Sequence, residues 1–382
     1  MTTPAPEPLP ESLPESLPES LREPLLDQIV QAIAPVGHQM DAAITGCLDS
    51  LTKPPGSLGR LEDMALHIGR IQRTIKPSVA HKVVTVFAAD HGVAAEGVSA
   101  YPAEVTPQMV LNFLSGGAAV NVLARHAGAR VVVADVGVNF DFPPPPRGPL
   151  AHKVARGTRS ITRGPAMSRN EARRALEAGI RVAVCEIGAG AELLAVGDMG
   201  IGNTTSSAAI TACLTGHTAA EVTGRGTGVD DAGLARKVRA VEQALEANSL
   251  PPAATAGSTD ALGVLAAVGG FEIGAIAGAI LGAARHRVPV IVDGYIATAG
   301  ALIAHALCPT ATEYMLAGHR SAEPGHRIAL GHLGLSPYLE MEMRLGEGSG
   351  AVLAMHLAEA ATRIMAEMAT FEGAGVSGRG EA

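Results

Sequence analysis

One carboxylate, Glu347, lies between two glycines in the segment RLGEGSGAVLA, residues 344–354. A glutamate that serves only solubility is expected on an exposed helix face. Flanking glycines instead let the backbone turn sharply and bring a ligand close. The small, apolar residues after the turn predict a helix. The pattern therefore predicts a single fixed carboxylate at the mouth of a helix, beside a bound molecule.

A glycine turn in the segment VGDMGIGNTTSSAAI, residues 196–210, is the second candidate ligand site. Gly200 and Gly202 let the backbone approach an anion. The polar residues at 203–205 supply side-chain donors at a predicted helix start, where free N–H groups bind phosphate. We interpret the turn as a phosphate cradle, with a plain tight turn as the alternative.

Two nucleotide-binding motifs compete with this interpretation. The turn reads GxGxxT, because Thr205 stands at the third glycine position of the dinucleotide fingerprint. The acid expected about 20 residues further on is also absent. A P-loop is excluded because the chain contains no Gly-Lys pair. An NAD(P)-dependent oxidoreductase is therefore a rival that the incomplete fingerprint disfavours.

Several other polar residues follow apolar runs. Asp90, Asp198 and Asp293 each come at or near the end of a strand candidate, where a parallel sheet binds its ligands; capping a helix is the alternative role for each. His319 and His326 are interpreted as loop histidines, because no third metal ligand stands at a useful spacing.

The predicted helix DDAGLARKVRAVEQAL, residues 230–245, carries one lysine at the border of its apolar face. Its predicted core stripe is Leu234, Val238, Val241 and Leu245. A border lysine usually extends to solvent, but Lys237 could also reach a phosphate. Lysine is scarce in this chain, which adds interest to this position.

Five apolar runs separated by helical stretches must position these residues. They are 83–90, 130–138, 193–200, 288–294 and 314–319. Continuous apolar strands alternating with helices are typical of a parallel sheet covered on both faces. The fold class predicted is α/β, with a Rossmann-like parallel sheet and a smaller helical domain built from the N- and C-terminal segments.

The predicted domain boundaries follow the composition. Residues 1–24 contain the repeat LPESLPESLPES and are expected to be a disordered low-complexity tail. Residues 25–80 are expected to form the N-terminal helical part of the small domain, and residues 81–340 the α/β core. Residues 341–382 are expected to supply a loop and helix that complete the small domain and the active site.

Charge and composition exclude several classes of function. The net charge is −8 and only 17% of residues are charged, so no basic surface for nucleic acid is expected. Four scattered cysteines predict buried thiols in a reducing compartment. The apolar stretches are broken by charges and no signal peptide is recognised. We therefore expect a soluble cytoplasmic protein without membrane contact.

Six motifs occur in one order along the chain. They are KPPGSLGRLE (53–62), DHGVAAEGVSAYPAEVTPQMVLNFLSGGAAVNVLAR (90–125), GDMGIGNTTSSAAI (197–210), GRGTG (224–228), VDGYIATAGAL (292–302) and RLGEGSGAVLA (344–354). This set resembles the nicotinate-nucleotide:dimethylbenzimidazole phosphoribosyltransferase family of cobalamin biosynthesis, over roughly residues 28–370. Six ordered motifs are far more specific than one glycine turn.

The resemblance implies transfer of the phosphoribosyl group from nicotinate mononucleotide to dimethylbenzimidazole, giving α-ribazole 5′-phosphate and nicotinate. The attacking base loses a proton as its bond to the sugar forms, so a general base is required. In the family that base is the glutamate of the GEG turn, which maps onto Glu347. The helix start lowers its pKa and an apolar pocket raises it, and the sequence leaves the net direction open.

The resemblance also implies the remaining site residues. The phosphate and ribose would be bound by Asp198, Gly200, Gly202, Asn203, Thr204, Lys237, Ser321 and Arg344. The base pocket would include Ser99, Tyr101 and Gln108. Asp198 stands where some members carry a glutamate, so its role is the weaker inference because the shorter acid reaches less far.

The resemblance implies no metal and no cofactor, since the leaving group is a cationic pyridinium that departs unassisted. It implies a homodimer, in which the KPPGSLG loop, residues 53–59, either completes the partner's site or forms a local turn. A non-catalytic protein that stores a nucleotide or base is the second rival. Such a protein would keep the glycine cradle but would not need Glu347.

Overall fold

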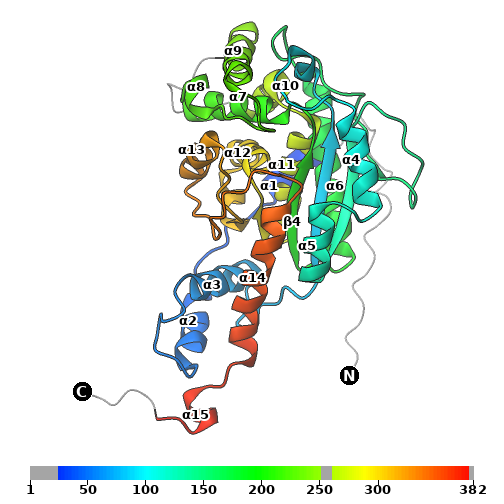
Figure 1. The fold of residues 1–382 in the computed structure, drawn as a ribbon. Coiled ribbons are helices and arrows are strands. Elements are labelled where there is room, and N and C mark those ends of the chain that lie inside the picture. The colour runs from blue at the N-terminus through cyan, green and yellow to red at the C-terminus, as the bar shows by residue number, and fades with distance from the viewer. Residues whose placement is uncertain (1–24, 251–259, 378–382) are drawn as a thin grey trace.

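The computed structural model describes residues 25–250 and 260–377, in which a central parallel sheet separates two layers of helices (Figure 1). The strands are β1 Lys82–Ala89, β2 Ala129–Gly137, β3 Leu150–Ala151, β4 Leu193–Met199, β5 Val290–Val292 and β6 Met315–Ala317. They pair in the order β3-β2-β1-β4-β5-β6, and every pairing is parallel. The predicted α/β fold with a Rossmann-like sheet is confirmed. All five predicted strands are present, and only β3 was missed, because two residues carry no apolar run.

Both faces of the sheet are buried, as the continuous apolar strands predict. Alternate residues of one strand enter different cores: Phe87 of β1 packs into one apolar cluster and its neighbour Val86 into the other. This two-sided burial leaves the ends of the strands as the places where polar side chains can gather.

The first face is covered mainly by α6 and α11, which pack tightly against each other. The helices on this side are α1 Leu25–Gln31, α6 Arg169–Gly188, α10 Ala261–Val268, α11 Phe271–Arg285 and α12 Tyr295–Leu307. Further helices that pack against α12 or against one another are α7 Asn203–Thr215, α8 Ala219–Val222, α9 Asp231–Ala247 and α13 Pro324–Leu333.

The second face is covered by α4, α5 and α14, and α3 packs along α14 (Figure 1). The helices on this side are α2 Asp41–Ser50, α3 Arg60–Gln72, α4 Val105–Leu114, α5 Ala119–Ala127 and α14 Ser349–Glu367. Three short helices complete the described ranges: η2 Gly92–Glu96, η3 Pro309–Tyr314 and α15 Phe371–Ala374.

The glycine spacing in α11 has a packing cause. A Cβ added at Gly278 would lie 1.8 Å from the carbonyl oxygen of Leu176, and a Cβ at Gly179 of α6 would lie 1.8 Å from the carbonyl oxygen of Ala275. Only glycine lets the two helix backbones come this close. The close packing of α6 against α11 therefore depends on these two glycines.

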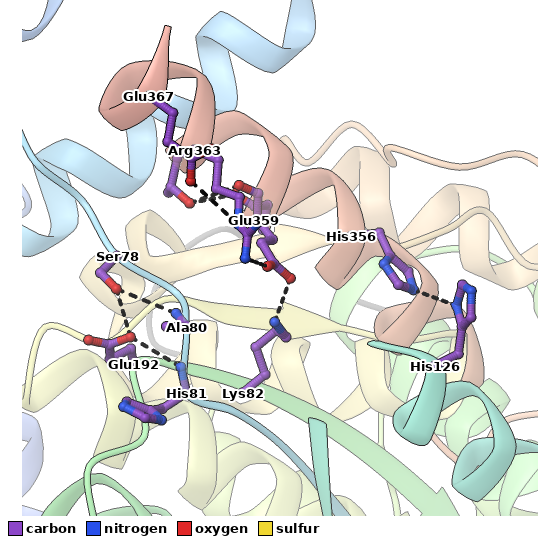
Figure 2. Close-up of polar contacts among 12 residues, drawn as sticks. Ser78, Ala80, His81, Lys82, His126, Glu192, His356, Glu359, Arg363 and Glu367 are labelled. Atoms are coloured by element: carbon purple, nitrogen blue, oxygen red, sulfur yellow. Dashed lines mark hydrogen bonds and ion pairs between the residues drawn. The ribbon is translucent and has the colours of Figure 1, made fainter. Parts of the chain in front are cut away.

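Helix α14 is anchored to the sheet and to α5 by polar contacts far from its N-terminus (Figure 2). The ammonium of Lys82 on β1 donates to Glu359 Oε2 at 2.6 Å. His126 Nδ1 on α5 and His356 Nε2 on α14 lie 3.0 Å apart and share a hydrogen bond. These contacts make α14 a rigid support for the turn that precedes it.

Several sequence-based expectations are settled or stay open at this level. No helix within residues 25–250 and 260–377 is long and apolar enough to cross a membrane. The expectation of uniformly buried thiols is wrong, because Cys185 on α6 is exposed and Cys47 on α2 is half-buried. The predicted tail at residues 1–24 lies outside the described residues.

Candidate active site

Three carboxylates meet at the carboxyl edge of the sheet, next to the point where the chain order reverses between β1 and β4. Asp198 lies near the end of β4, Asp293 follows β5, and Glu347 precedes α14. All three are at most 5% exposed. Open parallel sheets bind their ligands at this edge. Three elements distant in sequence thus place these predicted acids together.

The turn around Glu347 has an unusual backbone. Gly346, Glu347 and Gly348 all have positive φ, at 82°, 65° and 88°. Glutamate meets a steric cost in this left-handed region, which glycine does not. Residues held in such conformations concentrate at functional sites. The flanking glycines therefore do more than loosen the chain, since three successive left-handed residues aim the carboxylate inward.

The start of α5 and strand β4 hold this turn. The backbone N–H of Val120, in the first turn of α5, donates to Glu347 Oε2 at 3.3 Å. A Cβ added at Gly197 of β4 would lie 2.4 Å from the carbonyl oxygen of Glu347. The backbone of the turn thus rests directly on a glycine of the strand, and no larger residue fits between them.

Gly197→Ala is expected to reduce kcat about tenfold or more, because the added methyl displaces the backbone of the Glu347 turn. Steady-state kinetics and thermal unfolding check this. Gly331→Ala in α13 is the matched control, since a Cβ there meets nothing within 4 Å, and alanine favours a helix. Equal kinetics in the two variants would contradict the contact's importance.

Asp293 fixes the start of α14. Its Oδ1 accepts from the N–H of Ala351 at 2.7 Å and its Oδ2 from the N–H of Gly348 at 3.2 Å. A carboxylate on these free N–H groups stabilises a helix N-terminus. The sequence left two roles open for Asp293, ligand binding at a strand end and helix capping. The structure shows that it caps α14, the helix that follows Glu347.

The local environment raises the pKa of Glu347 above its usual range. Burial is the main cause, and the negative charge of Asp293 adds to it, while the N–H of Val120 opposes both. The direction that the sequence left open is thus upward. Burial also raises the pKa of Asp198 well above its usual range, with the charges of Asp293 and Glu272 contributing.

Asn203 faces the acids instead of an open anion site. Its Nδ2 donates to Asp198 Oδ2 at 2.9 Å, while Asp198 Oδ1 is buried without a partner. The side-chain donor expected for a phosphate is therefore engaged elsewhere. Asp198 and Asn203 form one polar unit between the Glu347 turn and the start of α7.

The glycine turn at 200–204 begins α7 as predicted. Gly202 caps the helix with φ 98°, and a Cβ at Gly200 would lie 2.4 Å from the carbonyl oxygen of Ala89. Thr204 is in the first turn of α7, and its Oγ1 accepts from Lys237 Nζ at 2.9 Å. The turn and Lys237 thus come together, as the phosphate interpretation requires.

The predicted core stripe of α9 is rotated from the observed one. Its buried residues are Gly233, Lys237, Ala240, Val241 and Ala244. Lys237 is only 1% exposed and does not extend to solvent. Burial lowers its pKa to about 8, partly offset by the charge of Glu323. Helix periodicity predicts Lys237 at the border of the apolar face of α9. Packing against α7 buries that border.

The GRGTG loop, residues 224–228, packs against Lys237. A Cβ at Gly226 would lie 2.7 Å from Lys237 Nζ. Arg344 Nη1 donates to the carbonyl oxygen of Gly226 at 2.9 Å, and the N–H of Gly226 donates to Glu323 Oε1 at 2.8 Å. Glu323 went unnoticed in the sequence, although it stands two residues after the predicted Ser321.

The segment after β6 also differs from the prediction. His326 lies in α13 and is fully buried, so it is no loop histidine. Its Nδ1 accepts from the N–H of Ser321 at 2.8 Å, and burial lowers its pKa to about 3. Pro324 at the first helical position starts α13. His326 therefore holds the backbone of Ser321 as a neutral ring.

Of the three predicted base-pocket residues, only Ser99 hydrogen-bonds another segment of the candidate site among the residues that the structure describes. Ser99 Oγ lies 3.2 Å from Thr227 Oγ1, which ties it to the GRGTG loop. Tyr101 is 55% exposed and Gln108 lies on the exposed side of α4. Within the described part of the chain, neither side chain hydrogen-bonds Glu347 or the 200–204 turn.

Comparison with known proteins shows the family of the chain. The family described as Phosphoribosyltransferase matches residues 33–376. The nicotinate-nucleotide–dimethylbenzimidazole phosphoribosyltransferase of Chloroflexus aurantiacus is 54% identical over 354 residues, which cover 92% of this chain and 99% of the relative. The enzyme of that name from Geotalea uraniireducens is 55% identical over 345 residues, covering 90% and 96%.

A solved structure has the same fold. The crystal structure of CobT from Thermus thermophilus superposes with a TM-score of 0.83 at 51% sequence identity, covering 88% of this chain and 98% of that one. The family match spans most of the chain, and the relatives are similar over nearly their whole length. The chain therefore belongs to this family of phosphoribosyltransferases.

Proposed function

We propose that this phosphoribosyltransferase moves the 5-phosphoribosyl group from nicotinate mononucleotide to 5,6-dimethylbenzimidazole. The products are α-ribazole 5′-phosphate and nicotinate, in the nucleotide-loop branch of cobalamin biosynthesis. The observation that carries the proposal is the buried Glu347, held in a left-handed turn beside a glycine cradle that contains Lys237. The names of these relatives support the two substrates.

In this mechanism the ring nitrogen of the base attacks the anomeric carbon of the ribose. The bond from that carbon to the pyridinium nitrogen breaks, and its electron pair neutralises the departing ring. Glu347 accepts the proton from the second ring nitrogen of the attacking base. A buried carboxylate with a raised pKa is a stronger base than an exposed one, which suits this step.

The remaining residues serve to bind and orient the donor. Gly200, Gly202 and Thr204 at the start of α7 would hold the 5′-phosphate, with Lys237 supplying the positive charge. Ser321 and Arg344 would complete this side, and the unit of Asp198 and Asn203 would face the ribose. Ser99, Tyr101 and Gln108 would line the base pocket.

The direct test is release of nicotinate by the purified protein. Release should require both nicotinate mononucleotide and dimethylbenzimidazole, and chromatography should show equal amounts of nicotinate and α-ribazole phosphate. An absence of release, with dimethylbenzimidazole and with every other nitrogenous base tried, would favour a binding protein over an enzyme. Reduction of a nicotinamide cofactor would instead support the oxidoreductase.

The proposal carries an expectation for pH dependence. Only the ionised form of Glu347 can accept a proton, and burial raises its pKa. The value of kcat should therefore rise with pH through a midpoint above the ordinary glutamate value of about 4.3. A kcat profile at saturating substrates measures this midpoint. A midpoint at or below the ordinary value would argue against Glu347 as the base.

We also propose a homodimeric, cytoplasmic protein. Leu111, Leu114 and Val122 on α4 and α5 are 36–53% exposed, and burial of such apolar side chains against a partner would be favourable. Light scattering would give the assembly state.

The division into a core at 81–340 and a helical unit from 25–80 and 341–382 is also proposed. The packing of α3 along α14 supports this unit, whereas α1 packs on α6 and α11 of the core.

A further inference from the structure

Three buried polar side chains are linked by hydrogen bonds next to the 200–204 turn, and none of them has a role in the mechanism above. His91 Nε2 lies 2.5 Å from Glu272 Oε1, and His91 Nδ1 lies 3.1 Å from Ser206 Oγ. All three side chains are at most 4% exposed. Burying such groups is costly unless they are paired, so this arrangement needs an explanation.

The three linked side chains come from three different elements. His91 follows β1, Ser206 lies in α7, and Glu272 lies in the first turn of α11. A Cβ added at Gly270 would lie 2.4 Å from His91 Cε1. The imidazole is thus held by two hydrogen bonds and packs against the backbone at Gly270.

The 200–204 turn packs against His91. A Cβ added at Gly200 would lie 3.3 Å from His91 Cδ2, and one added at Gly202 would lie 3.3 Å from His91 Cβ. Both glycines of the turn therefore lie directly against His91. The position of His91 thus bears on the position of the turn's backbone.

A serine, a histidine and an acid in line are the side chains of a nucleophilic triad. Here Ser206 is 0% exposed in α7, and its hydroxyl is engaged with His91 Nδ1. The arrangement therefore suits orientation of the backbone and not covalent catalysis. No local pattern marks it, since Ser206 and Glu272 stand 115 and 181 residues from His91.

We propose that Ser206, His91 and Glu272 form a positioning network that holds the 200–204 turn in the shape that binds the donor's phosphate. This rests on the proposed function, which assigns the phosphate to that turn. Phosphate binding by backbone N–H groups depends on their fixed geometry, because small displacements weaken several hydrogen bonds at once. In this proposal the three residues act through the turn and do not bind the donor themselves.

Ser206→Ala and Glu272→Gln test the network. Each should raise the KM for nicotinate mononucleotide and the Kd for inorganic phosphate together, by roughly tenfold. The value of kcat at saturating donor should change much less, because Glu347 is untouched. Ser207→Ala is the matched control: Ser207 is the next residue of α7 and is equally buried, and its hydroxyl has no partner among residues 25–250 and 260–377.

The double variant sharpens the test. If His91 transmits the effect of both partners, the double variant should be no worse than about the more severe single variant. Unchanged KM and Kd in both single variants, with only a lower Tm, would overturn the network as a positioning device. Ser206→Ala removes one hydroxyl only, so the test does not depend on replacing His91 itself, which could prevent folding.

Failure of the proposed function would look different. A wild-type protein that binds inorganic phosphate but releases no nicotinate would reject the reaction, while the phosphate Kd of the variants would still decide on the network. A wild-type protein that releases nicotinate, with Ser206→Ala and Glu272→Gln matching Ser207→Ala in KM and Kd, would reject the network alone.

Discussion

Glu347→Gln is expected to lower kcat by about a thousandfold, within the range that loss of a general base produces. The amide has the same shape as the carboxylate and can still accept from the N–H of Val120. It cannot take the proton that the attacking base must lose. The KM for nicotinate mononucleotide should therefore change little, and nicotinate release at saturating substrates is the measurement.

Glu342→Gln is the matched control for this variant. Glu342 is an exposed acid five residues before Glu347, and it too has a positive φ. The control should keep wild-type kcat, and thermal unfolding should show that both variants fold. If Glu347→Gln retains activity, the reaction stands but the base lies elsewhere, and Asp198 is the next carboxylate to replace.

Lys237→Met is expected to raise the KM for nicotinate mononucleotide by about 10- to 100-fold, the loss expected for one hydrogen bond to a charged group. Lys237 is buried against Thr204 at the start of α7, where the proposed phosphate lies. The melting temperature should change little, because the variant removes the desolvation cost of the buried ammonium together with its attraction to Glu323. Steady-state kinetics measure the effect on substrate binding, and thermal unfolding measures the effect on stability.

The same lysine predicts a pH dependence of substrate binding. Burial lowers the pKa of Lys237 to about 8, so the free enzyme loses this positive charge as the pH rises through that value. The KM for nicotinate mononucleotide should then increase above pH 8 in the wild type and stay flat in Lys237→Met. Lys76→Met, at an exposed lysine, should behave as the wild type. An unchanged wild-type KM up to about pH 10, well past the lowered pKa, would count against the role of Lys237.

The sequence alone determined the fold class and the local structure around the proposed base and phosphate. Apolar strands buried on both faces leave a continuous hydrophobic run, so all five predicted strands were found. The glycine turn at 200–204 and the GEG turn could be read locally, because positive φ and close backbone approach require glycine. These signals lie within a few neighbouring residues.

Only the tertiary structure decided how distant groups act on one another. The cap of Asp293 on α14, the bond between Glu323 and Gly226, and the contact of His91 with Glu272 join residues 55 to 181 positions apart. Helix periodicity put Lys237 at a border, and packing against α7 made that border interior. The pKa of Glu347 depends on burial and on the charge of Asp293. Both depend on which elements meet, and no local pattern records that.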